Sequence, residues 1–131
     1  LGWAVQRLGE GAAWQERTRR LADAAALPRQ GRAARLAYAE ELSRAADAIL
    51  PALALWLGWW RDVVLLQQGC PAAISNIDLA VELQAQARQF DSAQVQRFLA
   101  RLHAASVQVS QNVNIRLLLE TVLLHMPAPV I

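Results

Sequence analysis

Lysine is absent from this sequence, cysteine occurs once, and only 18% of the 131 residues are charged. A P-loop needs a lysine against the nucleotide phosphates, so the chain has no P-loop of its own. Schiff-base catalysis and lysine general-base catalysis are excluded for the same reason. The single Cys70 cannot form an intrachain disulfide, which is compatible with a reducing compartment.

No group of side chains has the sequence spacing of a catalytic or metal centre. The two histidines, His103 and His125, lie far apart in the chain and have no cysteine partner. The longest uncharged apolar stretch, residues 48–60, is shorter than the roughly 20 residues that span a bilayer. We therefore predict a non-catalytic chain with no cofactor, no metal ion and no membrane span.

Alanine and leucine dominate the composition. Together Ala (26) and Leu (21) fill 47 positions, against six glycines and five prolines. Both residues rank high in helix propensity, and apolar residues recur at steps of three and four along most of the chain. No stretch alternates like a strand, and no hairpin dipeptide occurs. The sequence predicts an all-α fold, a bundle of about five helices with short connections.

Glycine and proline set the predicted helix boundaries in the first half of the chain. We expect Gly9 and Gly11 to separate a short helix from a longer one, and residues 28–31 to form a linker. A second helix is predicted over residues 32–49. Pro51 should end or kink that helix, although proline is also favoured in the first turn of a new one.

Residues 52–68 are apolar on nearly every face. A helix of this kind is buried on all sides, either at the centre of a bundle or by another subunit. Gly69 is well placed as its C-terminal cap. Later helix starts carry cap residues: Ser75 with Asp78, Asp91 with Gln94, and Asn112 or Asn114.

Arginine is concentrated in one stretch of the chain. Between positions 17 and 35 six arginines accompany a single acid, Asp23: Arg17, Arg19, Arg20, Arg29, Arg32 and Arg35. Such a cluster is compatible with contacts to nucleic-acid phosphates, for which the first three arginines are the candidates. No aromatic residue lies between these arginines to stack on bases. A solvated helix face or an inter-domain contact is the alternative interpretation.

A motif in the 52–68 segment resembles a known family. Trp59, Arg61, Asp62, Leu66 and Gly69 reproduce the W-x-R-D-x-x-x-L-x-x-G pattern of the C-terminal domain of the bacterial DNA polymerase III delta-prime subunit. The related tau/gamma subunit is the second choice.

Two further elements extend the resemblance. Asn76 and Asp78 match the family's N-x-D element. Residues 112–120 match its N-x-N-P-R-L-x-L-E run, with Ile115 in place of the usual proline. The first 27 residues loosely resemble the end of an AAA+ lid.

The resemblance implies a subunit of the clamp loader, the pentamer that opens the sliding clamp and closes it around primer–template DNA during DNA replication. Residues 1–27 would be the C-terminal end of the AAA+ lid or linker helices. Residues 28–131 would be a helical collar, or oligomerisation, domain in a longer cytoplasmic protein. The implied partners are the other clamp-loader subunits. DNA and the clamp would be reached only through the rest of the complex.

Eight residues are candidates for the subunit interface: Trp56, Trp59, Trp60, Arg61, Asp62, Asn112, Asn114 and Arg116. The three tryptophans share one helix face and form either core or an aromatic patch against a neighbour. The Arg61–Asp62 pair either bridges to a neighbour or fixes the bundle internally. The last three residues are turn and cap residues first, and interface contacts second.

Two functions from different classes are consistent with these residues. The first is a non-catalytic collar domain that assembles with other subunits. The second is a stand-alone helical module that binds nucleic acid through the arginines of residues 17–35. Binding of the second kind would weaken steeply with salt, because each phosphate contact releases counterions.

Overall fold

The computed structural model of this chain describes residues 2–111 and 114–130, with side chains from Glu10 onward. The described residues form six α-helices and contain no strand, which confirms the all-α prediction. The helices are α1 (Gly2–Ala26), α2 (Arg32–Ser43), α3 (Ala46–Gln67), α4 (Ala80–Gln89), α5 (Ser92–Gln108) and α6 (Ile115–Leu124). Short 3-10 helices separate some of them: η1 (Leu27–Arg29), η2 (Pro71–Ala73), η3 (Ile77–Leu79) and η4 (Val109–Gln111).

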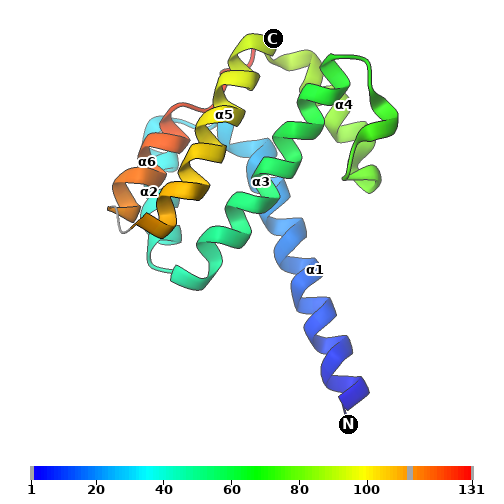
Figure 1. Cartoon of the computed structure of the whole chain (residues 1–131), viewed down its shortest axis with the longest axis vertical. Coiled ribbons are helices and arrows are strands. Elements are labelled where there is room, and N and C mark those ends of the chain that lie inside the picture. The colour runs from blue at the N-terminus through cyan, green and yellow to red at the C-terminus, as the bar shows by residue number, and fades with distance from the viewer. Residues whose placement is uncertain (1, 112–113, 131) are drawn as a thin grey trace.

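The α3 helix is the central element of the bundle. It packs against α1, α2, α4 and α5, while α6 lies against α2 and α5 (Figure 1). Its apolar residues therefore meet a neighbour on most sides, as its composition predicts. By length and composition alone α3 could also cross a membrane. Its place at the centre of the bundle accounts for that composition.

The N-terminal half of α1 leaves the bundle. Its C-terminal half packs on α3, whereas the first turns extend well beyond the other helices (Figure 1). Trp14, just outside the bundle, is 57% exposed. The helix thus has one half that is part of the core and one half that is free of it.

Aromatic rings occupy the centre of the core. Trp60 is fully buried, and its ring meets Phe90 and Phe98 edge-on at centroid distances of 5.3 and 5.5 Å. Trp56, four residues earlier, lies 5.8 Å from the ring of Tyr38 and donates its indole N–H to the carbonyl of Arg20. Edge-to-face contacts of this kind stabilise beyond the area that they bury.

Three predicted helix ends are confirmed. Gly69 has φ = 76°, and the amides of Gly69 and Cys70 donate to the carbonyls of Leu66 and Leu65, which is a Schellman motif closing α3. The other two are N-terminal caps. The side chains of Asp91 and Asn114 accept the backbone amides of Gln94 and Leu117, each at 3.1 Å.

Two predicted helix boundaries, one at Gly9 and Gly11 and one at Pro51, are wrong. α1 runs without interruption through Gly9 and Gly11, because glycine costs a helix about 1 kcal/mol without ending it. The predicted helix over 32–49 is divided after Ser43, and Pro51 lies inside α3 with its ring exposed to solvent. Both segments have the same apolar period, so periodicity alone did not locate the turn between them.

The predicted cap at Ser75 is also wrong. No side chain caps η3 or α4. The backbone amides of Ser75 and Asn76 instead donate to Asp62 on α3. A carboxylate from a distant helix has taken the place of the local Ser75–Asp78 pair.

Replacing Trp60 by alanine should destabilise the fold by about 3–5 kcal/mol, since it empties the centre of the core. Circular dichroism during urea unfolding measures the loss. Trp14→Ala is the matched control, because the same change at an exposed position should stay within about 0.5 kcal/mol. Equal unfolding midpoints for the two variants would contradict the core position of Trp60.

Candidate functional site

Asp62 is a fully buried carboxylate that organises the loop after α3. Its Oδ1 accepts the backbone amide of Ser75 at 2.9 Å. Its Oδ2 accepts the backbone and side-chain amides of Asn76, each at 2.8 Å. A buried carboxylate is stable only when its oxygens are hydrogen-bonded, and here three donors meet that need. The result is an internal tie between α3 and the start of η3.

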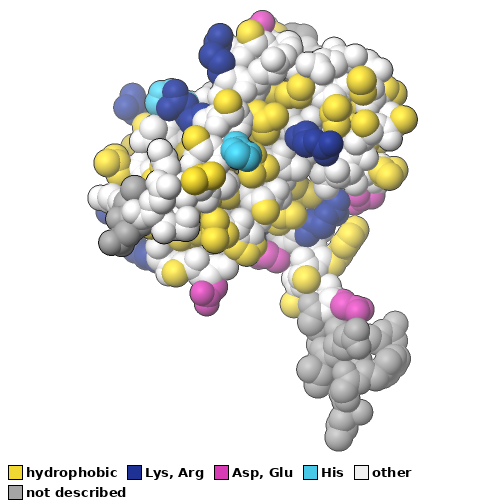
Figure 2. Space-filling model, viewed as in Figure 1, with side chains coloured by type: hydrophobic (Ala, Val, Ile, Leu, Met, Phe, Trp, Pro, Cys, Tyr) yellow, Lys and Arg dark blue, Asp and Glu magenta, His cyan; other side chains and the backbone are white. Residues whose placement is uncertain are grey.

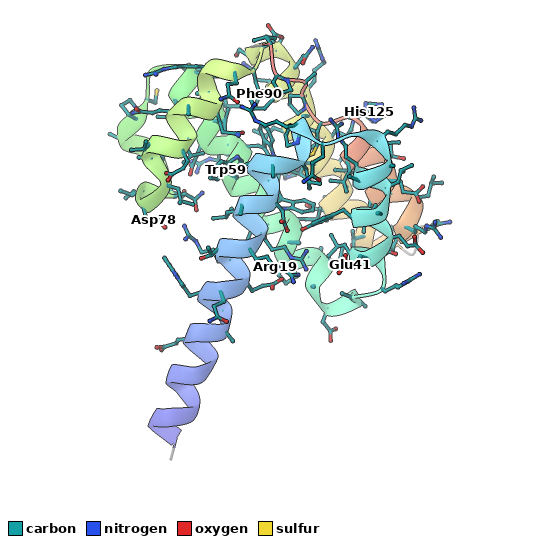
Figure 3. The ribbon with its side chains drawn as sticks, turned by 180° about the vertical axis from the view of Figure 1, so that it is seen from behind. Arg19, Glu41, Trp59, Asp78, Phe90 and His125 are labelled. Carbon is teal, nitrogen blue, oxygen red and sulfur yellow. The ribbon has the colours of Figure 1, made fainter. Side chains whose placement is uncertain are left out.

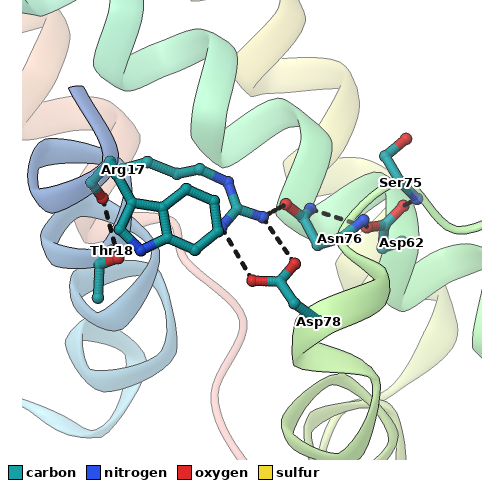
Figure 4. A network of polar contacts seen from close by, with 7 residues as sticks. Arg17, Thr18, Asp62, Ser75, Asn76 and Asp78 are labelled. Carbon is teal, nitrogen blue, oxygen red and sulfur yellow. Dashed lines mark hydrogen bonds and ion pairs between the residues drawn. The ribbon is translucent and has the colours of Figure 1, made fainter. Parts of the chain in front are cut away.

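The same tie continues to α1 (Figure 4). Arg17 donates to the side-chain oxygen of Asn76 at 2.7 Å and forms a two-pronged pair with Asp78 at 3.0 Å. The guanidinium of Arg17 lowers the pKa of the Asp78 carboxyl from its ordinary 3.8. Stability from this pair is therefore present above that pH and is lost as the pH falls through the lowered pKa. The network links α1 and η3 to α3.

A second polar cluster joins α1 to α2. Arg20, which is 6% exposed, donates to Glu16 at 2.8 Å and to the hydroxyl of Tyr38 at 2.7 Å. The Tyr38 hydroxyl donates in turn to Asp23. Burial and the bond to Asp23 raise the pKa of Tyr38 above its ordinary 10.0. The raised pKa favours the protonated phenol, so this stability is lost as the pH rises through it.

Several of the arginines in the 17–35 stretch, which the sequence suggested as phosphate contacts, have partners within the chain. Arg17 and Arg20 pair within the chain, and Arg19 lies 3.7 Å from Glu16. Arg35 donates to backbone carbonyls, including that of Leu123. On the face drawn in Figure 2 the basic side chains stand in separate groups. The intramolecular pairs favour a structural role for the stretch.

The three candidate interface tryptophans lie in the core. Trp56, Trp59 and Trp60 are at most 2% exposed, so none has surface to offer a partner in this fold. Asp62, a candidate either to bridge to a neighbour or to fix the bundle internally, is likewise buried. Arg61 is exposed and reaches the Ser75 hydroxyl at 3.4 Å.

Two of the remaining interface candidates, Asn114 and Arg116, lie at the start of α6. Asn114 caps the helix, and Arg116 is exposed and pairs with Glu120 at 3.0 Å. Leu117, beside them, is 58% exposed. Asn112 lies outside the described residues. An exposed patch that includes two of the predicted residues therefore remains at this end of the bundle.

A groove runs between α1 and α4, with a volume of about 520 Å³. Its floor is mostly apolar and includes Trp59, which lies between α1 and α3 in Figure 3, and Leu21. Gln86 donates its amide to the carbonyl of Ala25 at 3.2 Å. We call this feature the α1–α4 groove.

The residues of α4 in this groove were missed by the sequence reasoning. Gln86 is 7% exposed and falls at the same helical spacing as Leu79, Leu83 and Phe90, a set otherwise apolar. A polar residue in such a row indicates a special environment. The pairing of α4 with α1 joins segments 61 residues apart, which no local pattern encodes.

Among the described residues, no cluster of His, Cys, Asp or Glu side chains could hold a metal ion. The contacts described above are internal ties of the bundle, and its open surfaces lie at α6 and at the α1–α4 groove.

Comparison with known proteins adds one finding. A family model described as DNA polymerase III, delta subunit, C terminal, matches residues 12–127. No curated protein and no solved structure matches the chain.

Asp62→Asn should destabilise the fold by about 3 kcal/mol, because the new amide group points a donor at donors and leaves buried groups unpaired. Urea unfolding followed by circular dichroism measures the change. Asp78→Asn is the matched control, since the same substitution at an exposed carboxylate should cost much less. A comparable loss in both variants would contradict the buried role of Asp62.

Tyr38 is the only tyrosine of the chain, so tyrosinate absorbance reports on it alone. In the folded protein its titration should begin above pH 10, and in urea it should return to about 10. Asp23→Asn should lower the folded value, because Asp23 raises the pKa. An ordinary pKa in the folded wild-type chain would contradict the contact between Tyr38 and Asp23.

Proposed function

The chain belongs to the family of C-terminal domains of the DNA polymerase III delta subunit, which is a clamp-loader subunit family, and we propose that it acts as a collar domain. In this proposal residues 28–131 are the oligomerisation domain that holds a clamp-loader subunit among its neighbours. Residues 1–27 are the end of an AAA+ lid or a linker. The observation that carries the proposal is the family match over residues 12–127.

We assign the subunit as delta-prime, with tau/gamma as the second choice. The assignment rests on the W-x-R-D motif at Trp59 to Asp62 and on the run at residues 112–120. The structure gives the motif a physical meaning, because Asp62 ties α3 to the loop that carries the N-x-D element. Loss of either Asp62 or Asn76 would weaken the same contact between α3 and the loop before η3.

The proposed role needs a rigid bundle with surface left for neighbours. Rigidity is supported by the covered α3 and by the ties at Asp62 and Arg20. Surface is supported by large apolar side chains that are more than half exposed, among them Ile77, Val81 and Leu117. Exposed apolar side chains are common at protein contacts.

The geometry of α1 suits a chain that continues into another module. The first turns of α1 stand clear of the bundle (Figure 1). An AAA+ module joined there would connect through a single helix, itself fixed to the bundle by Arg17 and Arg20. In a cytoplasmic complex the collar would then meet DNA and the sliding clamp only through those modules.

Co-expression of the full-length protein with the other clamp-loader subunits tests the proposal. We expect one stable hetero-oligomer on size-exclusion chromatography that contains this chain. The matched measurement is filter binding of the 131-residue chain to DNA at two salt concentrations, where we expect no retention. Failure to co-purify, together with salt-sensitive DNA retention, would contradict the collar role.

A further inference from the structure

Several of the unpartnered buried polar atoms of the described bundle lie at the α1–α4 groove. Three buried polar atoms of its lining have no hydrogen-bond partner among the described residues: the indole N–H of Trp59 and the side-chain carbonyls of Gln86 and Gln89. A buried polar group without a partner costs free energy comparable to a lost hydrogen bond. Three such atoms at one groove single it out as the candidate for a surface that a partner outside the chain completes.

The two walls of the groove, α1 and the η3–α4 segment, run in the same direction and are held in one register by two contacts. Arg17 pairs with Asp78 and Ala25 receives the amide of Gln86, both with a separation of 61 residues. From the first contact to the second the walls extend about 12 Å, at about 1.5 Å per residue. The matched stretch therefore accommodates about two turns of a third helix.

Small residues keep the groove open. Ala22 and Ala26 of α1 and Ala85 of α4 line it and are exposed. Small side chains let a helix backbone approach closely. Trp14 lies one turn before Thr18 on the same side of α1, is 57% exposed, and extends this wall beyond the end of α4.

The secondary structure of the groove favours a helical occupant. A helix satisfies its own backbone hydrogen bonds, whereas an extended peptide needs a strand edge. The described residues contain no strand, so the groove has no strand edge to offer an extended peptide. Helix-in-groove recognition is therefore the mode that these walls permit.

The rim specifies the charges of the occupant. At the N-terminal end Arg17 and Asp78 neutralise each other. Farther along, Glu82 and Arg29 line the groove, are exposed, and form no ion pair among the described residues. In the register of the two walls they stand about two helical turns apart.

We propose that the α1–α4 groove receives an amphipathic helix of a neighbouring clamp-loader subunit. That helix carries apolar side chains against Trp59 and Leu21, a cation opposite Glu82 and an anion opposite Arg29. The inference rests on the proposed collar function and adds to it the place and chemistry of one contact. Apolar burial supplies affinity, and the two rim charges fix direction and register.

Groove-filling variants of the full-length protein test the proposal in the reconstituted complex. Ala85→Trp should weaken assembly about tenfold or more, because the new ring occupies the seat of the helix. Ala37→Trp, at an exposed alanine of α2 outside the groove, is the matched control and should assemble like the wild type. Circular dichroism establishes that both variants fold.

A charge variant keeps the test independent of packing. Glu82→Arg should weaken assembly several-fold, and more so at low salt, because two cations would then face each other. Glu41→Arg, at an exposed glutamate of α2, should not. A photo-crosslinker placed at Ala22 should capture a peptide of a neighbouring subunit that has helical apolar spacing.

The outcomes separate the two proposals. If the wild type assembles and both Ala85→Trp and Glu82→Arg assemble equally well, the groove proposal is wrong and the collar function stands. Crosslinks from Ala22 to a second copy of this chain would also overturn it. If the wild type itself does not assemble, both proposals fall.

Discussion

The packing of four helices around the apolar side chains of α3 is the constraint on which the rest of this structure depends. A 22-residue helix with apolar side chains on nearly every face cannot be stable until other helices cover it on each side. That requirement places α1, α2, α4 and α5 around it, and it explains why connections such as the 44–45 turn can be so short. The bundle is therefore organised around α3, with the other helices packed on it or on one another.

The packing of helices around α3 also buries a polar residue of α3, Asp62, which then needs hydrogen-bond donors from its neighbours. Asp62 lies in the buried part of the helix, so its carboxylate must bring donors with it. The donors come from the loop at Ser75 and Asn76, and Asn76 then receives Arg17 from α1. One buried carboxylate therefore fixes a loop and, through it, one of the contacts that hold α1 to the bundle.

The sequence predicted those features whose cause is local. Apolar period indicated the helical class, and cap chemistry located Gly69, Asp91 and Asn114. It failed where a distant group decided the outcome, as at Ser75, whose amide is taken by Asp62 thirteen residues earlier. The three tryptophans illustrate the same limit of local sequence patterns. Their spacing placed them on one face, but only the arrangement of neighbouring helices shows that this face is interior.

The cover over Trp59 at the α1–α4 groove consists largely of small and polar residues. Where α1 and α4 meet over that ring, their facing positions are mostly alanine and glutamine rather than leucine. Leucine is abundant elsewhere in the chain, so its scarcity where α1 and α4 meet is specific to these positions and does not reflect the overall composition. Ala and Gln seal a core poorly, yet they leave room and hydrogen-bonding groups for another chain. In the collar role that we propose, such a groove is a place where a neighbouring subunit adds to the packing over Trp59.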